Sequence, residues 1–200
     1  MSSVGAFAIF AAVLAITPGL DTMLVLRTTA LGGRRAGLAA VAGIALGCLV
    51  WAVASALGVT AVLAASRLAF EVLRWAGVVY LCYLGLRALL RKSTVEAAVP
   101  PAGGIRTGLT TNLLNPKVGV FYLSVMPQFL PAGLPVLAGS LLLGAIHIGL
   151  GAVWLTLLVL VSHRAAGLLK RPTVRRRLEQ LSGAVFLGFG LRLALERAPN

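Results

Sequence analysis

One carboxylate lies inside the apolar part of this chain. Asp21, in the stretch ITPGLDTMLVL, is the only aspartate. It comes six residues before Arg27, which is about 9 Å along a helix, so its short side chain does not reach the end of that apolar segment. The four glutamates all lie near the ends of apolar segments or between them: Glu71, Glu96, Glu179 and Glu196. A charge held in lipid costs a few kcal/mol unless it is paired, protonated or in contact with cavity water, so Asp21 is suited to carry a proton or to bind a cationic amine.

A proline interrupts two of the apolar segments near the middle. Pro18 does so in the first segment and Pro116 in the fourth. A proline inside a helix removes one backbone donor and crowds the carbonyl four residues earlier, so we expect the Leu14 and Asn112 carbonyls to need other partners. Gly19 loosens the first break further. In lipid such backbone is tolerated only where it is buried in protein or lines a cavity.

Polar side chains gather at both breaks. Asn112 and Asn115 surround Pro116. Thr17 lies one helical turn before Asp21, where a hydrogen bond between the two is expected. Simple proline kinks are common in membrane helices, but two matched breaks with polar residues at both favour a binding site.

Lys117 follows Pro116 directly and is a second buried charge. It lies about ten residues into its segment, roughly 15 Å deep, which is too deep for its side chain to snorkel. It therefore needs a partner, and three arrangements remain open. Lys117 can form an ion pair with Asp21 that is part of the site, or a salt bridge that only ties two parts of the fold together. A substrate that carries both an ammonium and a carboxylate can instead be met by Asp21 and Lys117 respectively.

Other residues with chemical potential are sparse. His147, in AIHIGLGAVW, is a candidate proton relay, although a lone histidine in a helix bundle is more often a packing residue. Gln128, in MPQF, is a candidate cap or gate on the outer side. Cys48 and Cys82 have no C-x-x-C motif and are expected to pack as small residues. The sequence shows no metal-ligand cluster and no phosphate-binding loop, so it predicts neither a metal nor another cofactor, and energy coupling must come from an ion gradient.

The elements that must position these residues are long and apolar. The chain has 200 residues, of which 59% are hydrophobic and 12% charged, whereas a soluble domain has roughly 25% charged residues. Runs long enough to cross a bilayer, about 20 helical residues each, occur at six places. They cover residues 4–26, 38–63, 68–90, 107–127, 134–162 and 179–195. We predict an all-α integral membrane protein with six transmembrane helices in a single domain, 1–200.

The positions of the basic residues predict the orientation in the membrane. The net charge of +13 does not indicate nucleic acid, because the charges gather in alternate connections between the spans. These connections carry Arg27, Arg34 and Arg35; Arg91, Lys92 and Arg106; and Arg164, Lys170, Arg171, Arg175, Arg176 and Arg177. By the positive-inside rule they face the cytoplasm, and both termini face outward. Their expected partner is the anionic lipid of the bilayer. No basic leader precedes the first span, so a removable signal peptide is not expected.

The second half of the chain echoes the first. The matches, in order, are Pro18 with Pro116, AGLAAVAG (36–43) with AGLPVLAG (132–139), and GLRALL (85–90) with GLRLAL (190–195). Each half holds three spans, an odd number, so the second half enters the membrane from the opposite side. We predict two inverted three-helix repeats, 4–91 and 105–197, joined by a cytoplasmic linker, 91–106. Such repeats are typical of secondary transporters with a site at the midplane.

Taken together, the motifs resemble those of one transporter family. The first span has TPGLD, GGRRAGLAAVAGIALG leads into the second, YLCYLGLRALL closes the third, and NLLNPKVGVFYLSVMPQF fills the fourth. The chain thereby resembles the LysE/RhtB family of amino-acid exporters over nearly its whole length. The resemblance implies export of amino acids or their derivatives across a bacterial inner membrane, driven by the proton motive force. It gives functional weight to Pro18, Gly19, Asp21, Asn115, Pro116 and Lys117. One departure is Leu20, where many members have a second proline, and five-span arrangements have also been considered in the family.

The sequence thus predicts a multi-pass secondary exporter of the inner membrane rather than an enzyme. Its candidate site for substrate and proton comprises Thr17, Pro18, Gly19, Asp21, Asn112, Asn115, Pro116 and Lys117. Asp21 is expected to bind a proton and the substrate amine in turn, which gives proton antiport. Two alternatives remain open: export of another small molecule or a cation on the same fold, and a membrane thiol redox carrier that uses Cys48 and Cys82. The motifs encode neither the substrate nor whether the protein forms a homo-oligomer.

Overall fold

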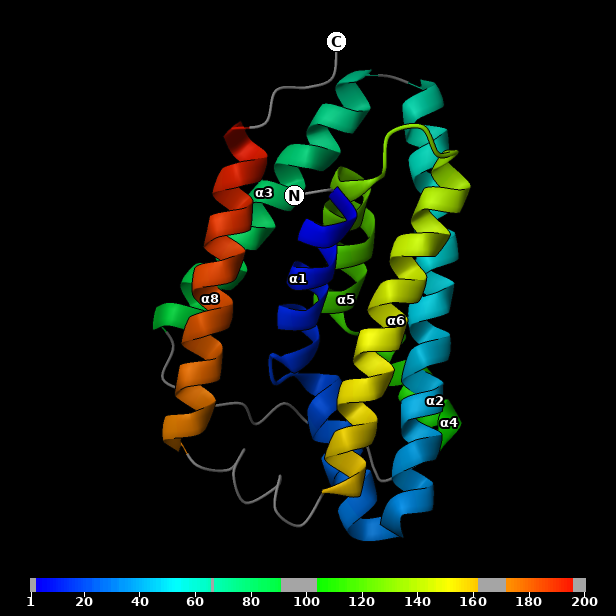
Figure 1. Ribbon diagram of the computed structural model, residues 1–200, viewed down its shortest axis with the longest axis vertical. Helices are drawn as coiled ribbons and strands as arrows, with labels where there is room; N and C mark the ends of the chain where they lie inside the picture. The colour runs from blue at the N-terminus through cyan, green and yellow to red at the C-terminus, as the bar shows by residue number, and fades with distance from the viewer. Residues whose placement is uncertain (1–2, 66, 91–103, 162–171, 196–200) are drawn as a thin grey trace.

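The computed structural model describes residues 3–65, 67–90, 104–161 and 172–195. Every regular element in these ranges is helical, which confirms the predicted all-α class (Figure 1). The predicted linker 91–106 lies outside the described residues as far as residue 103. The basic residues Arg91, Lys92, Arg164, Lys170 and Arg171 also lie outside them.

The first two helices are separated by the stretch that contains Pro18. Helix α1 (Ser3–Ile16) ends before it, and α2 (Leu20–Ala65) begins after it. Within α2, Gly33 has a φ of 75° and a ψ of −178°, so residues 20–32 and 34–65 form two separate helices. Only glycine adopts this φ without steric cost. Figure 1 shows the chain reversing direction at this turn, so that residues 34–65 run back alongside α6.

The segment around Pro116 consists of short helical pieces. Helix α4 (Ile105–Leu113) is followed by α5 (Pro116–Val120), by a π-helical turn η1 (Phe121–Val125) and by a 3₁₀ turn η2 (Met126–Phe129). Asn115 caps α5, because its side-chain Oδ1 accepts the backbone N–H of Lys117 at 3.1 Å. Proline is favoured at the first position of a helix, where its missing donor costs nothing. A proline and an N-cap residue therefore restart the helix at residue 116.

Close helix packing fixes where these pieces lie. Helix α4 packs on α2 so closely that a Cβ at Gly43 would overlap the Ile105 carbonyl, and one at Gly108 would overlap the Ala40 carbonyl. Helix α3 (Arg67–Leu90) packs on α8 (Pro172–Leu195) through Gly85 and Gly183. Small residues at such crossings are typical of membrane helices.

Aromatic side chains join α1 to the fourth and last segments. The rings of Phe7 and Phe10 on α1 each lie 5.8 Å from the ring of Phe121, measured between centroids. Phe10 also lies 4.6 Å from Phe189 of α8. Phe7, Phe10 and Phe121 are buried, so they form part of the hydrophobic core.

The helix surfaces are apolar. Large hydrophobic side chains are exposed on several helices, including Leu49 and Val50 of α2, Val79 of α3, and Val153 and Leu157 of α6 (Val136–Leu160). Two described stretches, Leu20–Gly58 and Val136–Leu160, are long and apolar enough to cross a membrane. The first of them contains the turn at Gly33. The six spans, their boundaries and the inverted repeat remain predictions.

Candidate functional site

The break after α1 leaves carbonyl groups that another segment satisfies. The N–H of Thr17 still bonds to the Val13 carbonyl at 3.0 Å, but Pro18 has no N–H to offer Leu14. The Leu14 carbonyl instead accepts a hydrogen bond from the Lys117 ammonium at 2.9 Å, and the Thr17 carbonyl accepts one at 3.3 Å. The structure thus supplies the partner that the sequence predicts for Leu14.

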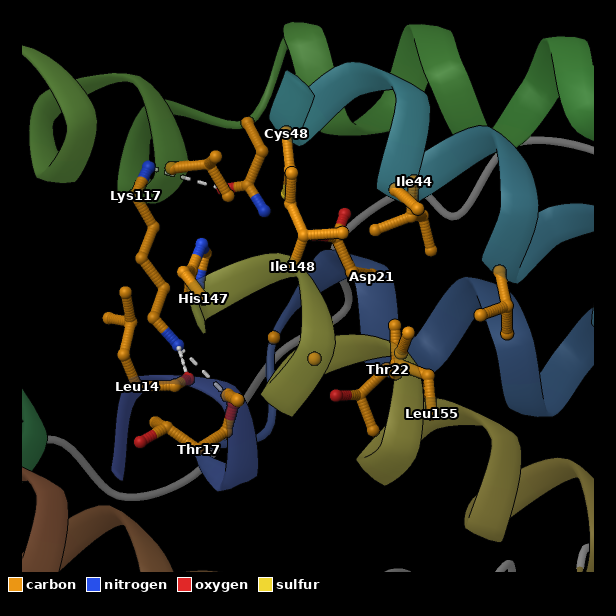
Figure 2. Close-up of a pocket in the computed structure, with 18 residues that line it drawn as sticks. Leu14, Thr17, Asp21, Thr22, Ile44, Cys48, Lys117, His147, Ile148 and Leu155 are labelled. Carbon is orange, nitrogen blue, oxygen red and sulfur yellow. Dashed lines mark hydrogen bonds between the residues drawn. The ribbon is translucent and has the colours of Figure 1, made fainter. Parts of the chain in front are cut away.

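Lys117 reaches α1 from the start of α5. Asn115 and Pro116 set the first turn of that helix, and the lysine side chain then extends toward the C-terminal end of α1 (Figure 2). A cation is stabilised at a helix C-terminus, where carbonyl groups concentrate partial negative charge. From the sequence the partner of Lys117 stayed open, and in the structure Lys117 bonds to backbone carbonyls at the end of α1. The break in one half is therefore held by a residue at the break in the other.

Asp21 lies in the first turn of α2, on the other side of the break. Its Oδ2 accepts a hydrogen bond from Asn112 Nδ2 at 2.9 Å. Its Oδ1 is buried and has no hydrogen-bond partner among the described residues. Asn112 is fully buried near the end of α4, so this bond links the two broken segments directly. One carboxylate oxygen remains available for a proton or a donor group.

A cavity of about 60 Å³ lies between the two breaks (Figure 2). This volume has room for several water molecules. Six of the predicted site residues line it: Thr17, Gly19, Asp21, Asn115, Lys117 and His147. Four do not line it: Pro18, Asn112, Pro116 and Gln128. Of these four, Asn112 still belongs to the site through its hydrogen bond to Asp21.

Thr17 does not play the predicted part. Its hydroxyl bonds to the Val13 carbonyl and to the Ser182 hydroxyl of α8, so the expected bond to Asp21 is wrong. The expectation assumed that Thr17 and Asp21 lie on one continuous helix. Because the helix is interrupted between them, the spacing of one turn no longer places them on the same face. Thr17 instead connects the break to α8.

His147 and Gln128 differ in their relation to the cavity. His147 is buried on α6, and its Nδ1 lies 2.9 Å from the Tyr122 hydroxyl. The Tyr122 carbonyl accepts a hydrogen bond from the Ser55 hydroxyl at 2.6 Å. Gln128 donates to the Ser124 carbonyl at 3.4 Å within its own segment. His147 is thus a hydrogen-bonded wall of the cavity, whereas Gln128 lies outside it.

The structure adds to the site three residues that the sequence analysis did not assign to it. Cys48 lines the cavity, and its Sγ lies 3.4 Å from Asn112 Nδ2. Thr22 lines the cavity beside Asp21, and Tyr122 orients the His147 ring. Thr22 and Tyr122 are polar residues inside apolar spans, and this feature of the sequence could have identified them as candidates for the site. Nothing in the sequence showed that Cys48 faces the fourth segment.

The donor set does not suggest a metal centre. Among the residues that the structure describes, no three His, Cys, Asp or Glu side chains come together in a group that could hold a metal ion. Cys48 and Cys82 are both free thiols, the first buried and the second exposed. The arrangement combines a carboxylate, an ammonium, amides and a small cavity, which can bind a zwitterion or exchange a proton.

Comparison with known proteins places the chain among transporters. A family model described as LysE type translocator matches residues 12–197. The uncharacterized membrane protein YrhP of Bacillus subtilis is 30% identical, over 98% of this chain and 100% of the relative. The homoserine/homoserine lactone efflux protein of Salmonella typhimurium is 29% identical over 96% of each chain. The leucine efflux protein of Klebsiella pneumoniae is 31% identical over 90% of this chain and 88% of its own. No solved structure matches significantly.

Proposed function

Because the chain belongs to the LysE type translocator family, we propose that it is a secondary exporter of amino acids or their derivatives that works by proton antiport across a bacterial inner membrane. Relatives named as amino-acid efflux proteins cover most of both chains, which supports this class of cargo. The observation that carries the proposal is Asp21. It lines the cavity between the two breaks, and its buried Oδ1 has no partner among the described residues.

In this mechanism Asp21 binds a proton and the substrate ammonium in turn. A carboxylate that is ionised attracts the ammonium, whereas protonation removes that attraction and releases the amine. Asn112 holds the other carboxylate oxygen, so it keeps the side chain oriented in both states. Lys117 has three donors and gives two of them to α1, which leaves one for the substrate carboxylate.

The proposed architecture is six spans in two inverted repeats. The spans are α1 with residues 20–32, residues 34–65, α3, the pieces from α4 to η2, α6, and α8. The crossing of α3 and α8 supports the repeat. A Cβ at Gly85 would meet Leu187, and a Cβ at Gly190 would meet Cys82. Gly85 and Gly190 are the matched glycines of GLRALL and GLRLAL, and positions 82 and 187 each precede them by three residues. The two contacts are therefore reciprocal, as a two-fold axis requires.

The arrangement of the ends supports the proposed orientation. Arg34 and Arg35 directly follow Gly33 at the turn, and Arg34 donates to the Leu160 carbonyl at the end of α6 at 3.2 Å. In Figure 1 this end of the bundle is opposite to the end where α8 finishes. With the basic end in the cytoplasm, both termini face outward.

The first experiment measures transport by purified protein in proteoliposomes. We expect amino-acid export to rise with an imposed proton gradient, and the variant Asp21→Asn to lose this dependence. Glu71→Gln, the same chemical change at a residue that does not line the cavity, is the control and should retain it. If Asp21→Asn exported amino acids at the wild-type rate over a range of proton gradients, the role assigned to Asp21 would be wrong. Transport of only a non-amino-acid cargo or a cation would favour the alternative on the same fold.

A further inference from the structure

The walls of the cavity are largely apolar. Aliphatic side chains from four helical elements line it, namely Leu14, Val41, Ile44, Val118, Ile148 and Leu155. Figure 2 shows Ile44, Ile148 and Leu155 lying around the space that Asp21 borders. Binding is favourable when an apolar wall removes an apolar group of the substrate from water. The same wall provides no hydrogen bond or counter-ion for a charged group.

The charges of the cavity match the main-chain groups of one amino acid. Asp21 and Lys117 are the carboxylate and the ammonium among the described residues that line it. An amino acid bound by its own ammonium at Asp21 and its carboxylate at Lys117 uses both. Its side chain must then contact residues such as Ile44, Ile148 and Leu155. A second charge on that side chain would be buried without a counter-ion. The cost of removing that charge from water would exceed the free energy gained from its contacts with the apolar wall.

We propose that the cavity selects neutral amino acids with aliphatic side chains and rejects basic and acidic ones. This inference rests on the proposed export function and narrows its substrate class. His147 also lines the cavity, but its Nδ1 is engaged by the Tyr122 hydroxyl, so it offers a substrate side chain one ring nitrogen and not the several donors that a buried carboxylate requires.

One glycine of α6 allows a direct test of the apolar wall. Gly151 lines the cavity, and a Cβ added there would meet no atom within 4 Å. Gly149 lies two residues earlier on the same helix, is exposed, and also has open space at its Cβ. Gly151→Val should therefore reduce the space for the substrate side chain without a backbone clash. Gly149→Val makes the same change to the same helix and leaves the cavity unaltered.

The experiment is counterflow in proteoliposomes with labelled leucine, alanine, phenylalanine, lysine and glutamate. We expect leucine to exchange at least about tenfold faster than lysine or glutamate. Gly151→Val adds three carbon atoms to the wall and should lower leucine exchange relative to alanine by at least about tenfold, since even one methylene of difference in a pocket is worth that order. Gly149→Val should keep the wild-type leucine-to-alanine ratio.

A second variant guards against a general loss of activity in Gly151→Val. Leu155→Ala enlarges the same wall and should raise exchange of phenylalanine relative to leucine. The proposal is wrong if lysine or glutamate exchanges as fast as leucine, or if neither variant changes the ratio between large and small substrates. Exchange of no amino acid, together with export of another cargo, would instead overturn the proposed function itself.

Discussion

At the scale of single residues, Lys117 has a structural task beside its proposed contact with substrate. Its ammonium lies 2.9 Å from the Leu14 carbonyl and 3.3 Å from the Thr17 carbonyl. Both groups lie at the end of α1, where the helix cannot supply a donor. A buried carbonyl left without a partner costs about 1–3 kcal/mol. Lys117 is therefore expected to stabilise the break as well as to bind a carboxylate.

This predicts a measurable loss of stability in Lys117→Met. The variant keeps much of the side-chain volume but removes the donors, so its free energy of unfolding in detergent should fall by about 1–3 kcal/mol. Lys117→Arg retains a charged donor and should lose less. Arg35→Met removes a charge from an exposed position and serves as the control. Equal stability of Lys117→Met and wild type, measured by circular dichroism during unfolding, would contradict this role.

Residue types predicted which groups of this site need a hydrogen-bond partner, but they did not predict which groups pair with each other. Pro18 alone shows that the Leu14 carbonyl needs a donor, and the depth of Lys117 shows that it needs an acceptor. That these two needs satisfy each other depends on how the first and fourth segments lie, which local sequence does not encode. The error at Thr17 has the same origin, because a break changes the angular relation of residues on either side. The place of Cys48 at the cavity was not predicted, because the sequence of an apolar helix does not show which of its faces meets the fourth segment.

At the scale of elements, the α2–α4 crossing sets the distance between the two breaks. Gly43 and Gly108 let the backbones touch, and Gly47 packs directly against Asn112. The hydrogen bond from Asn112 to Asp21 requires this close approach. Wider separation of the two helices would move the amide away from the carboxylate.

Gly43→Val is accordingly expected to damage both assembly and transport. Its Cβ would meet the Ile105 carbonyl and the Leu109 amide, which are backbone atoms that cannot rotate away. Overpacking of this kind costs typically about 1–3 kcal/mol and displaces the neighbouring helix. Gly58→Val, on the same helix but with open space at its Cβ, should behave like wild type. Comparable melting temperatures and transport rates for the two variants would show that the crossing tolerates a larger residue.

The helical segments themselves were predictable from apolar runs, whereas their ends were less so. The expected run 134–162 corresponds to α6, Val136–Leu160. The expected fourth run, 107–127, corresponds to α4, α5, η1 and part of η2 rather than to one helix. Hydropathy registers length and composition, and it does not register the loss of single hydrogen bonds that splits a helix at Asn115 and Pro116.

At the scale of the whole molecule, orientation in the membrane is open to a direct test. The turn at Gly33 and the loop before α6 lie at opposite ends of the bundle (Figure 1). The proposed orientation places the first in the cytoplasm and the second outside.

Single cysteines placed at these two ends test that orientation. In a background of Cys48→Ser and Cys82→Ser, a membrane-impermeant thiol reagent added to intact cells should label Leu134→Cys. It should label Arg35→Cys only after the membrane is permeabilised. Both residues are exposed, so a difference in labelling reflects the side of the membrane. The reverse pattern would invert the proposed topology.

The capping of α1 by Lys117 also bears on how the protein is made. The chain is synthesised from its N-terminus, so Leu14 is made about a hundred residues before Lys117. Until then, the carbonyls at the end of α1 have no ammonium to bind. During synthesis the first half therefore lacks the donor that these carbonyls bind in the folded protein. The break after α1 is complete only when residues 112–117 are in place. The final structure of the first half therefore depends on a contact that the second half provides.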